Sequence, residues 1–348
     1  MGKNYRKGNN QSTYAVKDRT GTEMLVEPEL IAAMWREYFE ELLNEETEVL
    51  AQEGMQERRQ NDENGNQDEI TMEEINTAVK KMKNGKSPGD DELPIEIFKA
   101  AGEVCMEWLK EILNAAWTQE KVPLDWQRAV VCPIFKKGER TDCANYRGIS
   151  LLSHIGKVYE RVIENRLRGS VEDVLGGWQH GFRPSRSTMD LVFALRMIME
   201  KSWEWNIKKY IAFIDMEKAF DRINRDKLWE VMQKREYNIE PKLIRVVKSM
   251  YKQTKSRIKN REIESEWFDI KTGVRQGGVL SPLLFILYMD SCLKEICTRE
   301  EREVTFAYAD DVAVITETKE DLQVAMTRWN DILKRMGMKI TKIKPRLW

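Results

Sequence analysis

The chain of 348 residues is 41% hydrophobic and 33% charged, which is enough apolar material for one large domain or two ordinary ones. No apolar run is long enough to span a bilayer, and the amino terminus lacks the apolar core of a signal peptide, so we expect a soluble intracellular protein. Five cysteines without a CxxC pair and only two histidines leave no disulfide framework, no HExxH zinc motif and little scope for a histidine-based triad. These features exclude most common hydrolase chemistries.

The near-neutral net charge conceals an uneven distribution of charged residues. Of the 57 basic and 58 acidic residues, 3 basic and 17 acidic ones lie between Glu23 and Glu74, which leaves 54 basic against 41 acidic residues elsewhere. This excess of basic residues outside 23–74 suits a phosphate-rich partner. A solvated lysine-rich surface explains the same excess equally well.

The first third of the chain is predicted to be mostly helical. Apolar residues at helical spacing predict a helix over residues 30–43, and the polar, low-complexity segment 51–69 predicts a flexible linker. The sequence TMEE at Thr71 matches a capping box at the start of a second helix. Glycine and proline predict a loop over 84–94, and a long helical stretch follows to about residue 119.

Beyond Trp126, short apolar strands alternate with amphipathic helices. The predicted strands are residues 129–135 and 210–215 and a hairpin over 304–316, and the predicted helices between and after them are 152–167, 187–205 and 322–336. No internal repeat is visible, so we expect a mixed fold of helices and strands.

Three of these segments carry residues that suit chemistry. A strand delivers Asp215 at its end, QGG (276–278) precedes a helix that starts at Ser281, and the predicted hairpin has Asp310 and Asp311 at its tip. Taken singly, the aspartates are ordinary turn formers and helix caps, and QGG is an ordinary turn. Together they indicate more, because an acidic tip between apolar strands is costly unless its charge is compensated. Divalent cations would compensate it, and carboxylates are the ligands that Mg²⁺ favours.

The order strand-Asp, QGxxxSP and YADD resembles motifs A, B and C of reverse transcriptases. Residues 145–167 and 177–192, which include NYRGISLL and QHGFRPSRST, are similar to the fingers segments of the non-LTR (LINE-type) retrotransposon branch. The resemblance covers residues 25–340. It implies an α+β fold, the right-hand polymerase fingers–palm with an antiparallel palm sheet and surrounding helices. It also implies an RNA-directed DNA polymerase.

The resemblance assigns the catalytic roles to three carboxylates. Asp215, Asp310 and Asp311 would hold two Mg²⁺ ions, for which Mn²⁺ can substitute, and the backbone carbonyl of Met216 would add a ligand. Asp215 and Asp310 would bridge the ions, with Asp311 in support. Such a pair of ions activates the primer 3′-hydroxyl and stabilises the leaving pyrophosphate.

The resemblance also assigns a nucleotide site. Phe220 would lie beneath the incoming sugar, for which plain core packing is the alternative. Gln276 and Gly277 would lie against the nucleotide, and Arg147 would clamp the triphosphate through its forked donors. Lys136 or its neighbour Lys137 would assist, although an exposed basic loop explains these lysines as well.

Residues 232–261 contain 10 Lys and Arg against two Glu, and the basic stretch 246–261 within them lies just before motif B. The resemblance puts it near a primer–template, so Lys252, Lys255 and Arg257 are expected to contact nucleic acid, as is Arg183 of the GFR segment. A solvated basic face is the alternative. The implied partners are an RNA template, a DNA primer and deoxynucleoside triphosphates, with no membrane, and the implied compartments are the nucleus and the cytoplasm.

Three regions are expected: an acidic connector arm with one helix and a flexible linker (1–69), fingers with interleaved palm helices (70–209) and a palm (210–348). Near the end of the chain Lys344 falls where the family has a lysine, but Pro345 follows it and the similarity fades. We therefore expect a copy truncated before the thumb. The alternative functions are an inactive retroelement fragment that only binds nucleic acid and, less well matched, a metal-dependent phosphohydrolase.

Overall fold

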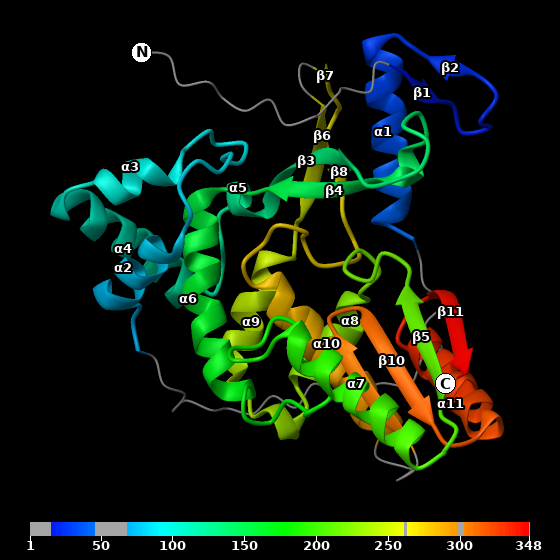
Figure 1. Cartoon of the computed structure of the whole chain (residues 1–348). Coiled ribbons are helices and arrows are strands. Elements are labelled where there is room, and N and C mark those ends of the chain that lie inside the picture. The colour runs from blue at the N-terminus through cyan, green and yellow to red at the C-terminus, as the bar shows by residue number, and fades with distance from the viewer. Residues whose placement is uncertain (1–14, 46–67, 261–262, 298–302, 348) are drawn as a thin grey trace, which may run out of the picture.

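A computed structural model of the chain describes residues 15–45, 68–260, 263–297 and 303–347 (Figure 1). Two sheets with helices around them organise these residues. All but the last two residues of the predicted linker (51–69) lie outside the described residues. Among the described residues no helix is long and apolar enough to cross a membrane.

A four-stranded antiparallel sheet, here called the palm sheet, lies in the carboxy-terminal half. Its strands, in spatial order, are β11 (Ile340–Leu347), β5 (Tyr210–Met216), β10 (Asp311–Thr316) and β9 (Val304–Tyr308). In β5, Ala212 and Ile214 are buried whereas Phe213 and Asp215 are exposed, as the two-residue period of a strand requires. One face of the palm sheet is therefore core and the other is open. The predicted strand and hairpin are confirmed, whereas β11 was not expected.

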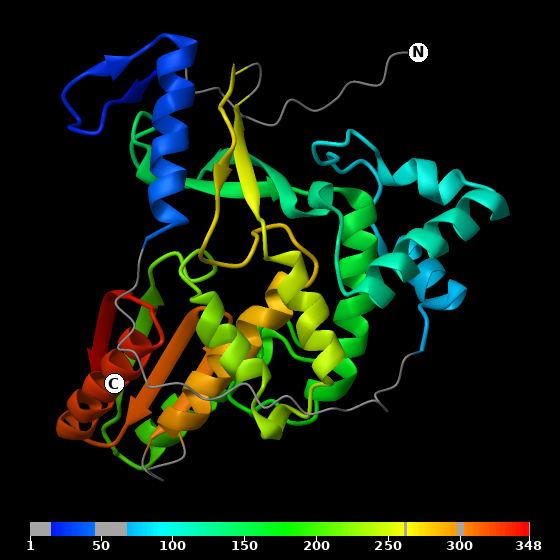
Figure 2. The same ribbon diagram turned by 180° about the vertical axis from the view of Figure 1, so that it is seen from behind.

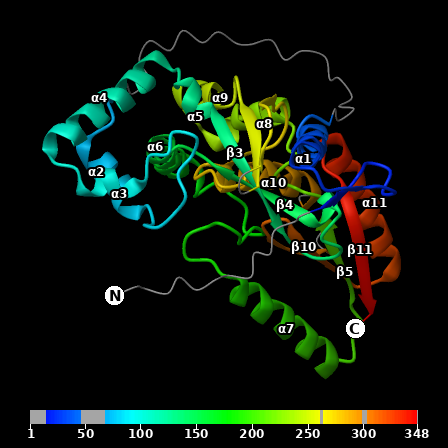
Figure 3. The same cartoon turned by 90° about the horizontal axis from the view of Figure 1, so that it is seen from above.

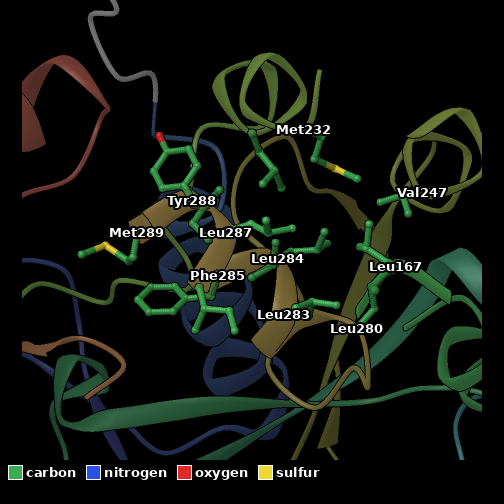
Figure 4. Close-up of a cluster of buried hydrophobic side chains, with 14 of the residues drawn as sticks. Leu167, Met232, Val247, Leu280, Leu283, Leu284, Phe285, Leu287, Tyr288 and Met289 are labelled. Carbon is green, nitrogen blue, oxygen red and sulfur yellow. The ribbon is translucent and has the colours of Figure 1, made fainter. Parts of the chain in front are cut away.

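Helices cover the buried face of the palm sheet. The central one is α10 (Ser281–Cys297), flanked by α11 (Lys319–Arg335) and α8 (Arg225–Met232), with α9 (Pro241–Met250) and α6 (His154–Val171) beyond. Because residues 282–289 of α10 are apolar on every side of the helix, this part can be buried all round. Figure 4 shows its leucines, such as Leu284, pointing toward Met232 of α8 and Val247 of α9.

A second sheet, here called the fingers sheet, consists of β3 (Arg128–Phe135), β4 (Tyr146–Leu151), β6 (Lys255–Asn260), β7 (Ile263–Glu264) and β8 (Phe268–Asp269). Helix α1 (Pro28–Leu42) packs on it through Trp35, whose ring meets Tyr146 edge-on at 4.9 Å. Beside α1 lies a short pair of strands, β1 (Val16–Lys17) and β2 (Met24–Leu25). The described part of the acidic arm is therefore continuous with the fingers sheet rather than separate from it.

The remaining helices extend away from the two sheets. Helices α2 (Met72–Lys81), α3 (Ile95–Ala100), α4 (Glu103–Gln119) and α5 (Leu124–Gln127) lie on the α6 side, and α7 (Thr188–Glu204) lies apart from the body (Figure 3). The predicted capping box is confirmed, because the Thr71 hydroxyl accepts from the Glu74 amide and the Glu74 carboxylate accepts from the Thr71 amide. Short 3₁₀ turns occur at Cys143–Asn145 and Arg235–Tyr237.

Candidate active site

Strand pairing brings the three predicted carboxylates to one edge of the palm sheet. Val312 of β10 pairs with Ile214 of β5 in antiparallel register. Asp311, which precedes Val312, therefore lies opposite Asp215, which follows Ile214. Asp310 precedes Asp311 in the turn between β9 and β10. The pKa of Asp311 is raised, first by desolvation and then by the negative charges of Asp310 and Asp215. The three side chains are thus electrostatic neighbours.

The donor set is of the kind that Mg²⁺ favours, because it consists of carboxylate oxygens at an exposed edge. As the side chains stand, no group of three or more His, Cys, Asp or Glu in the described part of the chain is arranged to hold a metal ion. Desolvation and then the negative charges of Asp310 and Asp215 raise the pKa of Asp311, and a bound cation would offset these charges. The three carboxylates therefore suit Mg²⁺ in ligand type and in their proximity to one another.

Two lysines from different sheets lie near these carboxylates. Lys136 follows β3 of the fingers sheet, and Lys344 belongs to β11, where it pairs with Phe213 on β5. Both ammonium groups act to lower the pKa of Asp311. Lys136 is exposed, so a solvated basic loop and a role beside the carboxylates both stay open for it. Lys344 keeps a place beside them although Pro345 follows.

A hydrogen-bonded series of three side chains joins Arg147 to the loop after β5. Arg147 Nε donates to Gln276 Oε1 at 2.6 Å, and Gln276 Nε2 donates to the two carboxylate oxygens of Asp221 at 2.7 and 2.6 Å. An ionised carboxylate only accepts, so Asp221 sets the orientation of the Gln276 amide and points its oxygen at Arg147. Two predicted nucleotide-site residues, Arg147 and Gln276, are thus brought together.

Asp221 was not among the residues expected from the sequence. The pKa of this carboxyl is raised from 3.8 to about 6, and desolvation is the largest cause of this shift. The Gln276 hydrogen bond and the charge of Lys218 act in the opposite direction. The sequence around Asp221 also contains Glu217, Lys218 and Arg222, so it gave no signal that this carboxylate would be buried.

The motif B loop is held closely against the fingers sheet. Gly277 has a φ of +120°, and a Cβ there would lie 2.5 Å from the carbonyl oxygen of Ser150, so only glycine fits. The Ser150 amide donates to the Gln276 carbonyl at 2.7 Å. A buried ion pair between Arg275 and Glu160 of α6, at 2.7 Å, anchors the same loop.

Phe220 packs as the alternative interpretation expects. Its ring stacks on Phe285 of α10 with centroids 4.4 Å apart and meets Phe182 edge-on at 6.0 Å. The residue as a whole is partly buried. A position beneath the incoming sugar therefore remains a proposal.

Gln179, within the GFR segment, holds the tip of the β9–β10 hairpin. Its side-chain amide makes two hydrogen bonds to the main chain of Ala309: Nε2 donates to the carbonyl at 3.2 Å, and Oε1 accepts from the amide at 2.9 Å. A Cβ at Gly181 would lie 2.3 Å from the Ala309 nitrogen. The flanking residues Trp178 and His180 pair with Ala307 through their main chains. The sequence had suggested a template contact for this segment and no contact with the hairpin tip.

The expected nucleic-acid contacts are not brought together. Arg183 is 9% exposed and donates to the Glu172 carboxylate and to nearby main-chain carbonyls, including that of Gly176 at 2.7 Å. Arg183 therefore stabilises its own loop, and its burial gives no support to a contact with a template. Arg257 pairs with Asp90 and Glu264, and Lys255 with Asp269, so both are engaged within the fingers sheet.

Residues 134–348 match the family model described as reverse transcriptase (RNA-dependent DNA polymerase). This match covers more than half of the chain, and the chain belongs to the reverse transcriptase family.

The curated relatives are proteins of non-LTR retrotransposons. The RNA-directed DNA polymerase from mobile element jockey of Drosophila melanogaster is 31% identical over 266 residues, or 73% of this chain and 28% of the relative. The probable RNA-directed DNA polymerase from transposon BS of the same species is 30% identical over 287 residues (79% and 31%). The Transposon TX1 uncharacterized 149 kDa protein of Xenopus laevis is 30% identical over 265 residues (74% and 20%). The chain spans under a third of each relative.

A solved structure of telomerase from Candida tropicalis, in complex with the TWJ fragment of telomeric RNA, shares the fold at a TM-score of 0.50 and 14% identity. The match covers 73% of this chain and 45% of that one. The predicted fold class, an α+β fingers–palm, is confirmed at this level.

Proposed function

We propose that the chain is an RNA-directed DNA polymerase that adds deoxynucleotides to a primer 3′ end opposite an RNA template. The observation that carries this proposal is that strand pairing brings Asp215, Asp310 and Asp311 to one edge of the palm sheet, where Lys136 and Lys344 act electrostatically on Asp311. Membership of the reverse transcriptase family supports the reaction class. If the acidic residues were only turn formers, there would be no reason for Lys136 to lie near them or for Arg147 to be held by hydrogen bonds through Gln276.

Each group has a definable task in this reaction. Asp215, Asp310 and Asp311, with the Met216 carbonyl, would hold two Mg²⁺ ions, which when bound supply activation of the primer hydroxyl and charge stabilisation at the pyrophosphate. Arg147, oriented by Gln276, would present its forked donors to the triphosphate. Lys344 Nζ would hold the proton that the leaving pyrophosphate takes up.

Primer extension tests the proposal. A DNA primer annealed to an RNA template is incubated with Mg²⁺ and deoxynucleotides, and Asp310→Asn serves as the matched variant because it removes one charge at constant size. We expect complementary extension by the wild-type chain and a loss of at least about a hundredfold in the variant, since such ion contacts contribute several kcal/mol.

The other two functions give different results in the same assay. A folded wild-type chain that binds the hybrid with salt-sensitive affinity but does not extend it would support the fragment that only binds nucleic acid. Release of phosphate from nucleotides without a primer would support the phosphohydrolase. Either result would contradict the polymerase.

A further inference from the structure

A large groove lies on the α8 and α9 side of the molecule. Its volume is about 1070 Å³, and it is lined by the end of α4, by α8 and α9, and by the segment after β8. Figure 2 shows α8 and α9 facing the viewer, and Figure 3 shows them on the opposite side of the palm strands from α7. Because Asp215 is on the exposed face of the palm sheet, the helix layer separates this groove from the carboxylate edge.

The groove carries an excess of positive charge that the described protein does not neutralise. Four lysines in its lining have no acidic partner among the described residues: Lys121, Lys248, Lys252 and Lys271. Of its three acidic residues, Glu45 pairs with Arg222 at 2.8 Å and Glu120 pairs with Arg245 at 2.6 Å. Only Asp226 is left to oppose the lysines.

A further cation lies at the groove wall. The Arg225 guanidinium donates to main-chain carbonyls, including those of Gly273 at 3.0 Å and Ile270 at 2.9 Å, and lies over the Tyr251 ring at 5.1 Å. These partners are dipoles and a ring, with no carboxylate hydrogen-bonded to Arg225 in the described part of the chain. Its full positive charge therefore adds to that of the lysines.

We propose that this groove binds the phosphodiester backbone of a single nucleic-acid strand, separately from the primer–template. Lysines on three different elements suit a ligand with repeated phosphates, since one small anion needs only two or three donors. The partly exposed ring of Trp229 in the lining offers a surface on which a base can stack. An acidic protein segment would use the charges but not the ring. The proposal rests on the proposed function, in which an RNA strand must continue beyond the active site.

The test measures binding of a fluorescent, unstructured single-stranded RNA by anisotropy while an unlabelled short RNA–DNA hybrid saturates the cleft. Lys248→Glu with Lys271→Glu is the groove variant, and Lys80→Glu with Lys81→Glu on exposed α2 is the charge-matched control. We expect the groove variant to bind at least about tenfold more weakly. Its salt slope should fall by about 1.4, because each single-strand phosphate contact contributes about 0.7. The control variant should bind like the wild type.

Further measurements separate this inference from the polymerase proposal. The groove variant should keep its thermal unfolding midpoint and extend a short hybrid normally, whereas Asp310→Asn should bind the single strand normally. The same assay with DNA of identical sequence distinguishes an RNA strand from a DNA strand, and binding of either supports the groove. Equal weakening in both lysine variants would overturn the inference. So would displacement of the RNA by polyglutamate at equal charge, which would indicate a site for acidic protein segments.

Discussion

Ala309 has a left-handed backbone conformation, with a φ of +55°, directly before Asp310. This conformation is unfavourable for a residue with a Cβ, so something must hold it. The buried amide of Gln179 does so by bonding both the amide and the carbonyl of Ala309. We therefore infer that Gln179 positions the hairpin tip without touching substrate itself.

Gln179→Met keeps the size of the side chain and removes these bonds. We expect primer extension to fall and the Mg²⁺ concentration for half-maximal rate to rise by about tenfold, because Asp310 is no longer fixed. The nucleotide KM should change little. Gln127→Met is the control, since Gln127 is also a buried glutamine that accepts a main-chain bond, from Gln253. An unchanged Mg²⁺ requirement in Gln179→Met would contradict the positioning role.

Asp221 should leave a signature in the pH dependence of stability. Its pKa is about 6 in the folded protein against an ordinary 3.8, so between these values the folded state binds more protons than the unfolded state. The free energy of unfolding should therefore fall as the pH rises from about 4 to about 6, by at most about 3 kcal/mol. Asp221→Asn should remove this fall. Urea unfolding across the pH range measures it, and identical profiles for the two proteins would refute the assignment.

At the scale of elements, the motif B loop depends on a buried ion pair. Glu160 of α6 accepts from Arg275 and also from the Val279 amide at 2.6 Å, so it fixes the loop at two points. Removing one partner of a buried pair leaves an uncompensated charge, which typically costs about 3–5 kcal/mol.

Glu160→Met and Arg275→Met should therefore each destabilise the protein by about that amount. The double variant should lose clearly less than the sum, because no lone charge remains buried. A double-mutant cycle of urea unfolding measures the coupling. Additive losses would show that the two side chains do not act as a pair.

Local sequence pattern predicted the elements whose signal is local. The strand ending at Asp215, the hairpin over 304–316 and the capping box at Thr71 all have their period or partner within a few residues. Strand β11 was missed because Pro345 argues against a strand. It lies at the edge of the palm sheet, where proline is tolerated.

The basic stretch of β6 was interpreted by charge alone, and charge does not show partners that are distant in sequence. Arg257 pairs with Asp90, 167 residues away, and its guanidinium lies over the Trp267 ring. A lysine or arginine with such partners looks the same in the sequence as one that is free for nucleic acid, such as Lys252 in the groove.

At the scale of the whole molecule, the candidate site is assembled from both sheets. The palm sheet contributes Asp215, Asp311 and Lys344, and the fingers sheet contributes Lys136 and Arg147. The motifs suggested these residues as candidates. They could not predict that Asp221 orients Gln276 or that Gln179 supports Ala309, because these contacts depend on how distant segments pack.

The most direct test of the account is the rate of single-nucleotide incorporation on an RNA-templated DNA primer, measured against Mg²⁺ concentration. Asp215→Asn, Asp310→Asn and Asp311→Asn are compared with the wild type, and the exposed Asp173→Asn is the control. We predict a cooperative rise with Mg²⁺ in the wild type and the control, and a maximal rate at least about a hundredfold lower in each of the three variants. A wild-type rate in any of the three, or a rate independent of Mg²⁺, would contradict it.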